Sequence, residues 1–427
     1  MRLVEPTDGM VITEDTVFKP GVYVLPRGLT VDADGVTVDG NGALLVGQGR
    51  TGSGVIVEGR ANVTLKNLRI QEYYHGVAAQ HCRQLAVAGC HITATAEMPP
   101  NTAFLDIWQD ADHAYGGGIW LRVVTESHIL ENDLQHQMCG LLTYHCRDLQ
   151  VRGNVANYCS GFGFHLYGTG YSVFENNAAD FCCRYEPRGP RVGHMGADAA
   201  GFLIVHGACW NVFRRNNARM SGDGFFLAGL TPQGKHVGCD DNAFEENDGS
   251  YSPNIAFEAT FSSGNTYRDN IAHACNYGFW LGFSRHGTLE HNQMVGNRQA
   301  GIAVENGFGF DVRNNTFQDN AHGVLLWSKH IPAFARAVPD NDTSHDWTIE
   351  NNIFTGNRTA IRIAADQDHG IRPLDPSGRW GQPALVPHDH IIRRNAITDN
   401  VVGVELVGAE ETTLAENQFH GNIRDMA

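Results

Sequence analysis

Apolar and polar residues alternate in short stretches along most of the chain, and each stretch opens with glycine and closes near an asparagine. Residues 278–292, GFWLGFSRHGTLEHN, show the pattern, which returns at 301–315, 161–177 and 140–154. Alternation with a period of two predicts half-buried β-strands. Because a repeat this short cannot bury its own apolar face, successive copies are expected to stack on one another.

Two series of marker residues share one period. Most of the Asn residues that follow a short strand are 22 or 23 residues apart, and they are Asn67, Asn132, Asn154, Asn176, Asn216, Asn247, Asn270, Asn292, Asn314, Asn351, Asn395 and Asn417. The residues that open the strands are Gly54, Gly76, Gly118, Gly140, Gly163, Gly201, Gly224, Asn254, Gly278, Gly301, Gly323, Ala360 and Gly403. This period, with three short strands per repeat, predicts an all-β, right-handed parallel β-helix of about 13 coils. The Asn side chains are expected to sit at tight turns and to form one ladder from coil to coil.

The first residues differ from the rest. Residues 1–50 carry strands but imperfect repeats, and they predict an N-terminal cap with a first irregular coil, whereas residues 51–427 predict the β-helix itself. Five segments are longer than a turn requires, at 97–117, 184–200, 230–241, 329–347 and 365–389. Long loops on a rigid scaffold usually form the walls of a binding site, so we expect them beside the functional residues.

Charge and composition exclude some classes of partner. The formal net charge of -16 argues against nucleic acid and against anionic membranes, and no apolar run is long enough to predict a membrane span. The start, MRLVEPTDGM, lacks the pattern of a signal peptide, which predicts a cytoplasmic location, or a secreted or periplasmic one if a signal peptide has been trimmed. Ten Cys without a CxxC pair predict reduced, buried thiols.

No cofactor and no metal site are predicted. Asp106, Asp110 and Asp112, next to His113 in LDIWQDADH, could offer oxygen ligands to Ca²⁺. Their spacing, however, matches no EF-hand loop, so a solvated acidic loop is the simpler interpretation.

The glycine- and asparagine-rich coils resemble the pectate-lyase-like superfamily of right-handed parallel β-helices, and within it the NosD-like repeats of carbohydrate-binding and sugar-hydrolase proteins. The resemblance covers nearly the whole chain. It implies a carbohydrate site on the outer face of one strand stack, and the superfamily includes pectate and alginate lyases, polygalacturonases, other glycosidases, alginate epimerases and phage tailspikes. The fold by itself does not choose among these activities.

In each strand after its opening residue, the first and third side chains are expected to face the core and the second and fourth to face outward. The outward positions hold many rings, namely Trp120, Tyr144, His165, Tyr167, Phe226, Trp280 and Trp327. Rings that face solvent can stack on the C–H faces of sugars. The sequence therefore predicts an oligo- or polysaccharide substrate, with Trp120, Phe226, Trp280, Trp327 and His206 as binding residues.

The first functional hypothesis is a glycoside hydrolase. Glu258, Gly282 and Glu305 are expected to occupy one column of three consecutive coils, which would place the two carboxylates roughly 9–10 Å apart across the glycine. Paired carboxylates near this separation suit inverting hydrolysis, with Trp280 as the sugar platform. Asp223, in SGDGF, could be a third carboxylate or a turn cap.

A loop at 184–198 is expected beside this strip. It carries Arg184, Arg188, Arg191, His194 and Asp198. Three guanidinium groups would favour an anionic sugar, although the same residues could form a solvated loop.

Two alternatives stay open. Tyr144, His165 and Tyr167 could move the C5 proton of a uronate in a lyase or epimerase, with an Arg or Lys neutralising the carboxylate. The Asp-Pro-His motif of alginate epimerases is met only by Val-Pro-His-Asp at 386–389, and the polygalacturonase motifs are absent. The third possibility is a non-catalytic carbohydrate-binding or assembly scaffold.

Overall fold

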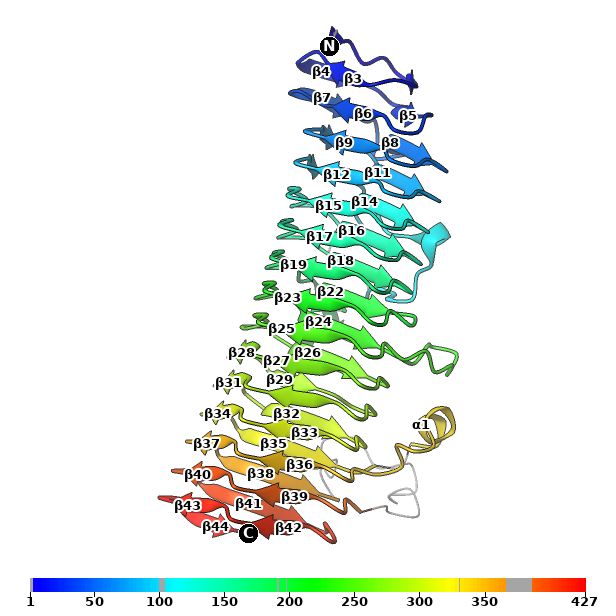
Figure 1. Cartoon of the computed structure of the whole chain (residues 1–427). Coiled ribbons are helices and arrows are strands. Elements are labelled where there is room, and N and C mark those ends of the chain that lie inside the picture. The colour runs from blue at the N-terminus through cyan, green and yellow to red at the C-terminus, as the bar shows by residue number, and fades with distance from the viewer. Residues whose placement is uncertain (1–2, 100–103, 190–191, 197, 330, 366–385) are drawn as a thin grey trace. The chain divides into compact units, whose positions relative to one another are not determined.

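The computed structural model describes residues 3–99, 104–189, 192–196, 198–329, 331–365 and 386–427. Contacts divide the chain into two compact units, Met1–Asp223 and Gly224–Ala427. Within each unit, strands of successive coils lie one above another (Figure 1). Two sheets of parallel neighbours, called here sheet 1 and sheet 2, run along each unit. A shorter parallel sheet, called here sheet 3, accompanies them in each unit, with four strands in the first and six in the second.

In the first unit, strands follow one another in each sheet in the order of the coils. Sheet 1 consists of β1 (Leu3–Val4), β3 (Thr16–Phe18), β6 (Thr37–Asp39), β9 (Thr64–Lys66), β12 (Ala86–Ala88), β15 (His128–Leu130), β17 (Gln150–Arg152), β19 (Val173–Glu175) and β23 (Val212–Arg214). Sheet 2 consists of β2 (Val11–Ile12), β5 (Leu29–Val31), β8 (Ser53–Glu58), β11 (His75–Gln80), β14 (Gly117–Arg122), β16 (Cys139–Tyr144), β18 (Phe162–Tyr167) and β22 (Ala200–Val205). Sheet 3 consists of β4 (Gly21–Val24), β7 (Ala43–Val46), β10 (Arg69–Gln71) and β13 (His91–Thr93).

The second unit repeats this arrangement. Its part of sheet 1 consists of β25 (Ala243–Glu245), β27 (Thr266–Arg268), β30 (Thr288–Glu290), β33 (Asp311–Arg313), β36 (Thr348–Glu350), β39 (Ile391–Arg393) and β42 (Thr413–Ala415). Its part of sheet 2 consists of β24 (Asp223–Ala228), β26 (Ile255–Thr260), β29 (Tyr277–Trp280), β32 (Ala300–Glu305), β35 (His322–Trp327), β38 (Thr359–Ala364), β41 (Val402–Val407) and β44 (Arg424–Met426). Its part of sheet 3 consists of β28 (Ile271–His273), β31 (Gln293–Val295), β34 (Thr316–Gln318), β37 (Ile353–Thr355), β40 (Ala396–Thr398) and β43 (Gln418–His420).

Among the residues that the structure describes, few elements lie outside the coils. In the first unit they are the 3-10 turn η1 (Ala111–His113) and an antiparallel hairpin of β20 (Tyr185–Gly189) and β21 (Val192–Met195). In the described part of the second unit, the short helix α1 (Pro332–Ala337) is added. The predicted all-β parallel β-helix is therefore confirmed, and the thirteen predicted coils correspond to the strands of sheet 2 from β8 to β41.

Close approach of the backbones explains the glycine at the start of each strand in sheet 2. A Cβ atom added to Gly140 would lie 2.6 Å from the carbonyl oxygen of Gly163 in the next coil, and one added to Gly301 would lie 2.8 Å from that of Gly323. Glycine avoids this close approach, and the only larger residue that the structure shows at the opening position of these thirteen strands is alanine, at Ala256 and Ala360. The glycine series is thus a direct consequence of coil spacing.

One predicted opening residue is wrong. In the structure Ile255 pairs with Tyr277 and Phe257 pairs with Phe279, so Ala256, and not Asn254, occupies the position of Gly278. A shift by two residues keeps the same alternation of inward and outward side chains. The hydrophobic pattern therefore could not reveal the error.

The inward positions form the predicted core. Side chains such as Ile119, Leu121, Phe164 and Leu166 are fully buried. Phenylalanines of neighbouring coils stack, as Phe257 and Phe279 do with ring centroids 4.8 Å apart. Stacking of like residues on like residues holds each coil to the next.

Buried asparagines form ladders, but not always at the predicted residues. Nδ2 of Asn132 donates to Oδ1 of Asn154, and Nδ2 of Asn154 donates to Oδ1 of Asn177. In the second unit the same ladder runs through Asn247, Asn270, Asn292, Asn315, Asn352, Asn395 and Asn417.

Asn67, Asn176, Asn314 and Asn351, which the sequence placed in the ladder, are exposed and have positive φ angles. In the doublets Asn176-Asn177, Asn314-Asn315 and Asn351-Asn352 the first residue takes the left-handed turn and the second is buried. A second ladder, absent from the prediction, runs through Asn297, Asn320, Asn357, Asn400 and Asn422.

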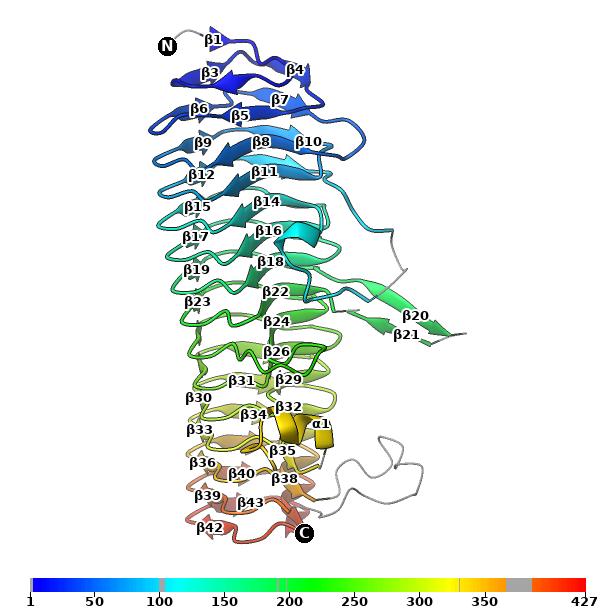
Figure 2. The same ribbon diagram turned by 90° about the vertical axis from the view of Figure 1, so that its right-hand side faces the viewer.

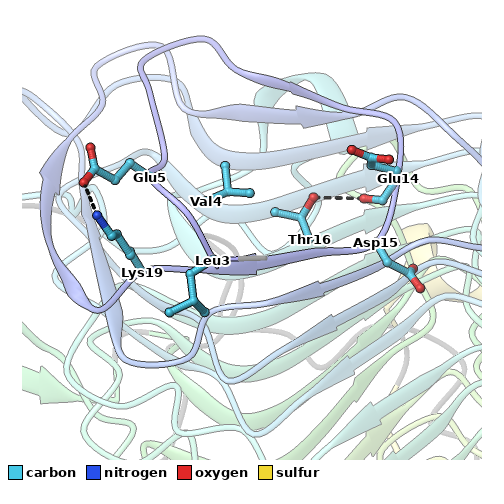
Figure 3. A pocket seen from close by; sticks show the side chains of 7 residues that line it. All are labelled: Leu3, Val4, Glu5, Glu14, Asp15, Thr16 and Lys19. Carbon is cyan, nitrogen blue, oxygen red and sulfur yellow. Dashed lines mark hydrogen bonds and ion pairs between the residues drawn. The ribbon is translucent and has the colours of Figure 1, made fainter. Parts of the chain in front are cut away.

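The first coil surrounds a hollow of about 750 Å³ at the start of the first unit (Figure 3). Leu3, Val4 and Thr16 lie along it, and Lys19 forms an ion pair with Glu5 at 2.8 Å. Its lining offers an ion pair and aliphatic groups but no aromatic ring.

Candidate functional site

Sheet 2 of the first unit brings a cation and two phenols into one column. Arg122 on β14 pairs with Tyr144 on β16, and Tyr144 pairs with Tyr167 on β18. Side chains at paired positions of neighbouring parallel strands point to the same face, about 4.8 Å apart. The three groups therefore lie in a row on the outer face of the sheet.

Two histidines complete this row at the ends of the strands. The ring of Tyr167 lies 4.2 Å from that of His206 and 5.4 Å from that of His145, between ring centroids. A Cβ atom on Gly168, whose φ is +58°, would come within 2.6 Å of Nδ1 of His145. Glycine at this position thus leaves room for the imidazole. We call Arg122, Tyr144, His145, Tyr167 and His206 the Tyr-His cluster.

The described part of the insertion at 97–117 packs over the outer face of the same sheet. The hydroxyl of Tyr74 donates to the carbonyl oxygen of Ala114 at 2.8 Å, and Nε2 of His75 lies 3.1 Å from that of Tyr115. The ring of Tyr115 contacts that of Phe162 at 6.1 Å. Figure 2 shows the helical turn of this insertion beside β14 and β16.

This cover corrects the expectation that the outward rings face solvent. Tyr144 is 1% exposed and His165 is 2% exposed, whereas Trp120 is only half-buried. His165 contacts the rings of Phe162 at 5.5 Å and Tyr144 at 5.3 Å. His165 therefore lies behind the Tyr-His cluster, where it supports Tyr144.

Burial controls the protonation of these groups. It lowers the pKa of His165 to about 3 and raises that of Tyr144 well above its usual value. Burial also lowers the pKa of His145, with Arg122 adding to the shift, and raises the pKa of Tyr167, with Asp110 adding. At neutral pH the cluster therefore combines the neutral imidazole of His145 with the protonated phenols of Tyr144 and Tyr167.

Carboxylates of the insertion lie beside the cluster. Asp112 forms an ion pair with Arg122, with 2.8 Å between Oδ1 and Nη1. Asp110 accepts hydrogen bonds from the backbone N–H groups of Asp112 and His113 and thereby caps η1. From the sequence, Asp110 and Asp112 were considered only as possible ligands of Ca²⁺.

The predicted arginine loop is placed only in part. Arg184 is 5% exposed and donates through Nη2 to the carbonyl oxygen of Pro99, so it ties the insertion to the body of the unit. Arg188 lies in β20, Asp198 is half-buried with a φ of 60°, and Arg191 lies outside the described residues. Asp223, at the start of β24, is 1% exposed rather than open to solvent.

The second unit presents a different outer face on sheet 2. Glu258 pairs with Trp280, and Trp280 pairs with Ala303, whereas Glu305 lies two residues further along β32. The expected column of Glu258, Gly282 and Glu305 is therefore wrong, because the strand opens at Ala256. Two strand spacings and two residues separate the Cα atoms by about 12 Å.

Aromatic rings in this face pack on one another. The rings of Trp280 and Trp327 lie 5.4 Å apart, and Tyr277 lies 4.9 Å from Trp280. Trp327 and Glu305 are each 3% exposed, whereas Glu258 and Trp280 are half-buried. The solvent-facing strip predicted here is thus partly closed by its own side chains.

Gly282 leaves room for the ring of Trp280. Its Cβ position would lie 3.2 Å from Nε1 of Trp280 and 4.0 Å from the carbonyl oxygen of Glu305. Phe226, on β24, is 7% exposed. Trp280 therefore reaches over Gly282 toward β32.

Arg122 and His145 are functional candidates that sequence reasoning missed. Arg122 shares its strand position with Tyr144 and Tyr167, as the period of the repeat also indicates, so the sequence did carry a signal for it. His145 follows the strand in a left-handed turn, where the alternating pattern carries no signal.

In the part of the chain that the structure describes, no group of three or more His, Cys, Asp or Glu side chains could hold a metal ion. No described helix is long and apolar enough to cross a membrane. All ten thiols are free and nine are buried, which confirms the prediction for the cysteines.

Comparisons with known families agree with this architecture. Residues 21–218 match the family described as right handed beta helix region. This match supports the predicted resemblance to the pectate-lyase-like superfamily of right-handed parallel β-helices. Residues 198–371 of this β-helix match the family described as periplasmic copper-binding protein (NosD).

Solved β-helices give only distant likenesses. A variant of the periplasmic alginate epimerase AlgG is 12% identical, with 93% of this chain and 79% of the other covered and a TM-score of 0.47. A GH136 lacto-N-biosidase from Eubacterium ramulus is 13% identical, with 81% and 62% covered and a TM-score of 0.46. The A-module of the mannuronan C-5 epimerase AlgE6 from Azotobacter vinelandii is 14% identical, with 97% and 87% covered and a TM-score of 0.38. At these TM-scores the likenesses carry no argument about activity, and no curated protein sequence matches the chain.

Proposed function

We propose that this β-helix is a carbohydrate-active enzyme that transfers a proton at C5 of a uronate in an oligo- or polysaccharide, as a lyase or an epimerase. The observation that carries the proposal is the row of Arg122, Tyr144 and Tyr167 on three successive strands, edged by His145 and His206. Such chemistry needs a base, an acid and a cation near one carbon atom.

The roles follow from the protonation states. His145 takes the C5 proton as a neutral imidazole, His206 packs against Tyr167 beside it, and the guanidinium of Arg122 stabilises the enolate that forms on the sugar carboxylate. In an epimerase Tyr167 returns a proton to the opposite face of C5. In a lyase Tyr167 protonates the leaving oxygen while the C4–O bond breaks and a C4–C5 double bond forms.

The test uses uronate oligosaccharides in D₂O. Deuterium at C5, seen by NMR, reports epimerisation, and ultraviolet absorbance of the unsaturated product reports elimination. Tyr167→Phe should remove either signal. Tyr171→Phe is a matched control, because Tyr171 is exposed and stacks on Trp210, 4.9 Å away, outside the cluster. If Tyr167→Phe keeps full activity, the cluster is not the active site.

A second candidate is a glycoside hydrolase in the second unit. The supporting observation is that Trp280 pairs with Glu258 on one side and reaches over Gly282 toward Glu305 on the other. Glu258→Gln and Glu305→Gln should then abolish hydrolysis of a neutral oligosaccharide. If binding without turnover is found for both uronic and neutral sugars, the protein is a binding scaffold instead.

A further inference from the structure

A carboxylate of the insertion, that of Asp112, pairs with Arg122, the cation of the Tyr-His cluster. Oδ1 of Asp112 is held 2.8 Å from Nη1 of Arg122, and the Asp112 side chain is 68% exposed. An exposed partner of this kind can be displaced, because a surface ion pair contributes little net free energy. Arg122 itself lies on β14 at one end of the row, next to Tyr144.

The backbone of the insertion cannot easily leave with Asp112. Leu105 is 3% exposed, Ala114 is 5% exposed, and the carbonyl oxygen of Ala114 accepts from Tyr74. Asp110 also accepts from Nδ1 of His113 at 2.8 Å, which keeps the capped turn together. The Asp112 side chain can therefore rotate away while the rest of the insertion stays in place.

We infer that Asp112 is a built-in mimic of the substrate carboxylate, which holds Arg122 until a uronate replaces it. The inference rests on the proposed function and adds to it a residue that sets the affinity for anionic sugars. Asp112 is a positioning residue, since it acts through Arg122 and not on the sugar.

The experiment compares Asp112→Asn with the wild-type chain. Binding of galacturonate and mannuronate trisaccharides is measured by titration calorimetry, and the methyl-esterified galacturonate trisaccharide serves as the uncharged probe. Asp112→Asn should bind the uronate about two- to fivefold more tightly and lower KM by a similar factor, with kcat little changed. The ester should bind equally to both proteins.

Two further variants isolate the contact. In an Arg122→Gln background, Asp112→Asn should have no effect on uronate binding. Asp32→Asn is the matched control, because Asp32 pairs with Arg60 at 2.5 Å on the surface of the same unit, away from the cluster. Asp32→Asn should leave uronate binding unchanged.

The outcomes separate the two proposals. If the wild type binds and converts a uronate but Asp112→Asn binds it no more tightly, the mimic is refuted and the proposed function stands. An equal gain for the ester, or a gain that persists with Arg122→Gln, also refutes the mimic. If neither protein binds any uronate, the proposed function fails and the inference fails with it.

Discussion

The outer faces of sheet 2 in the two units derive from one sequence pattern but become different surfaces. In the first unit, an insertion anchored by Leu105 and Ala114 covers the rings and leaves a polar edge around Arg122. In the second unit, Trp280 and Trp327 pack on each other beside half-buried or buried glutamates. Outward position on a strand therefore does not define a binding surface; what packs against it does.

The difference also separates two kinds of chemistry. The first face offers neutral imidazole, phenol and guanidinium, which suit proton transfer next to a carboxylate. The second offers carboxylates next to an indole, and Arg362 on β38 forms an ion pair with Glu405 on β41 at 2.5 Å. Each prediction below either breaks this contrast or makes it sharper.

The largest effect on turnover is expected from substitutions in the Tyr-His cluster of the first unit, compared with a substitution at Glu258 in the second. His145→Asn and Tyr167→Phe should each lower turnover of a uronate oligosaccharide by about 10²- to 10⁴-fold, the usual contribution of a general acid or base. Glu258→Gln should leave that turnover within a factor of two or so of the wild type. Steady-state rates and circular dichroism of each variant give the answer, and the reverse ranking would move the active site to the second unit.

Interior ladders should be alike in both units. Asn315→Ala removes the acceptor of two Asn292 donors, which lie 2.9 and 3.0 Å away, so we expect a loss of about 3 kcal/mol or more in the free energy of unfolding. Asn154→Ala in the first unit should cost a similar amount. Asn314→Gly is the control and should change stability by about 0.5 kcal/mol or less, because Asn314 is exposed with a φ of 57°. Equal losses for Asn314 and Asn315 would refute the ladder assignment.

Acid should weaken the first unit through its buried histidines. The folded-state pKa values of His165 and His75 are lowered by burial to about 3 and about 4, below the ordinary value of about 6.5 in the unfolded chain. The unfolded chain therefore binds protons that the folded chain excludes, so stability is lost as pH falls from about 6.5 toward these values. His165→Phe should flatten this part of a plot of Tm against pH. His128→Gln, at an exposed residue of β15, should leave the plot unchanged.

The smallest effect concerns the thiols, most of which lie in the first unit. Alkylation of the folded protein should label chiefly Cys183, the one half-buried cysteine, and leave the nine buried thiols unmodified. Unfolding without a reductant should expose all ten to the reagent. Mass spectrometry counts the adducts, and the loss of labelled sites through disulfides would contradict the free state of the cysteines.

Much of the fold could be predicted from the chain alone. The period of 22 or 23 residues, the inward residues and the openings at Gly140 or Gly301 were readable because each coil repeats the same local constraints. Alternation determines which side chain faces the core. Glycine is favoured where an added Cβ atom would lie within 3 Å of a carbonyl oxygen of the next coil.

The candidate site needed the tertiary structure. A shift of two residues at β26 preserves alternation, so only pairing with β29 showed that Glu258 stands beside Trp280. The cover over Tyr144 and His165 depends on contacts such as that of Tyr74 with Ala114, forty residues later in the chain. A repeating pattern determines what every coil shares, whereas a single insertion that packs across several coils is decided by contacts between residues far apart in sequence.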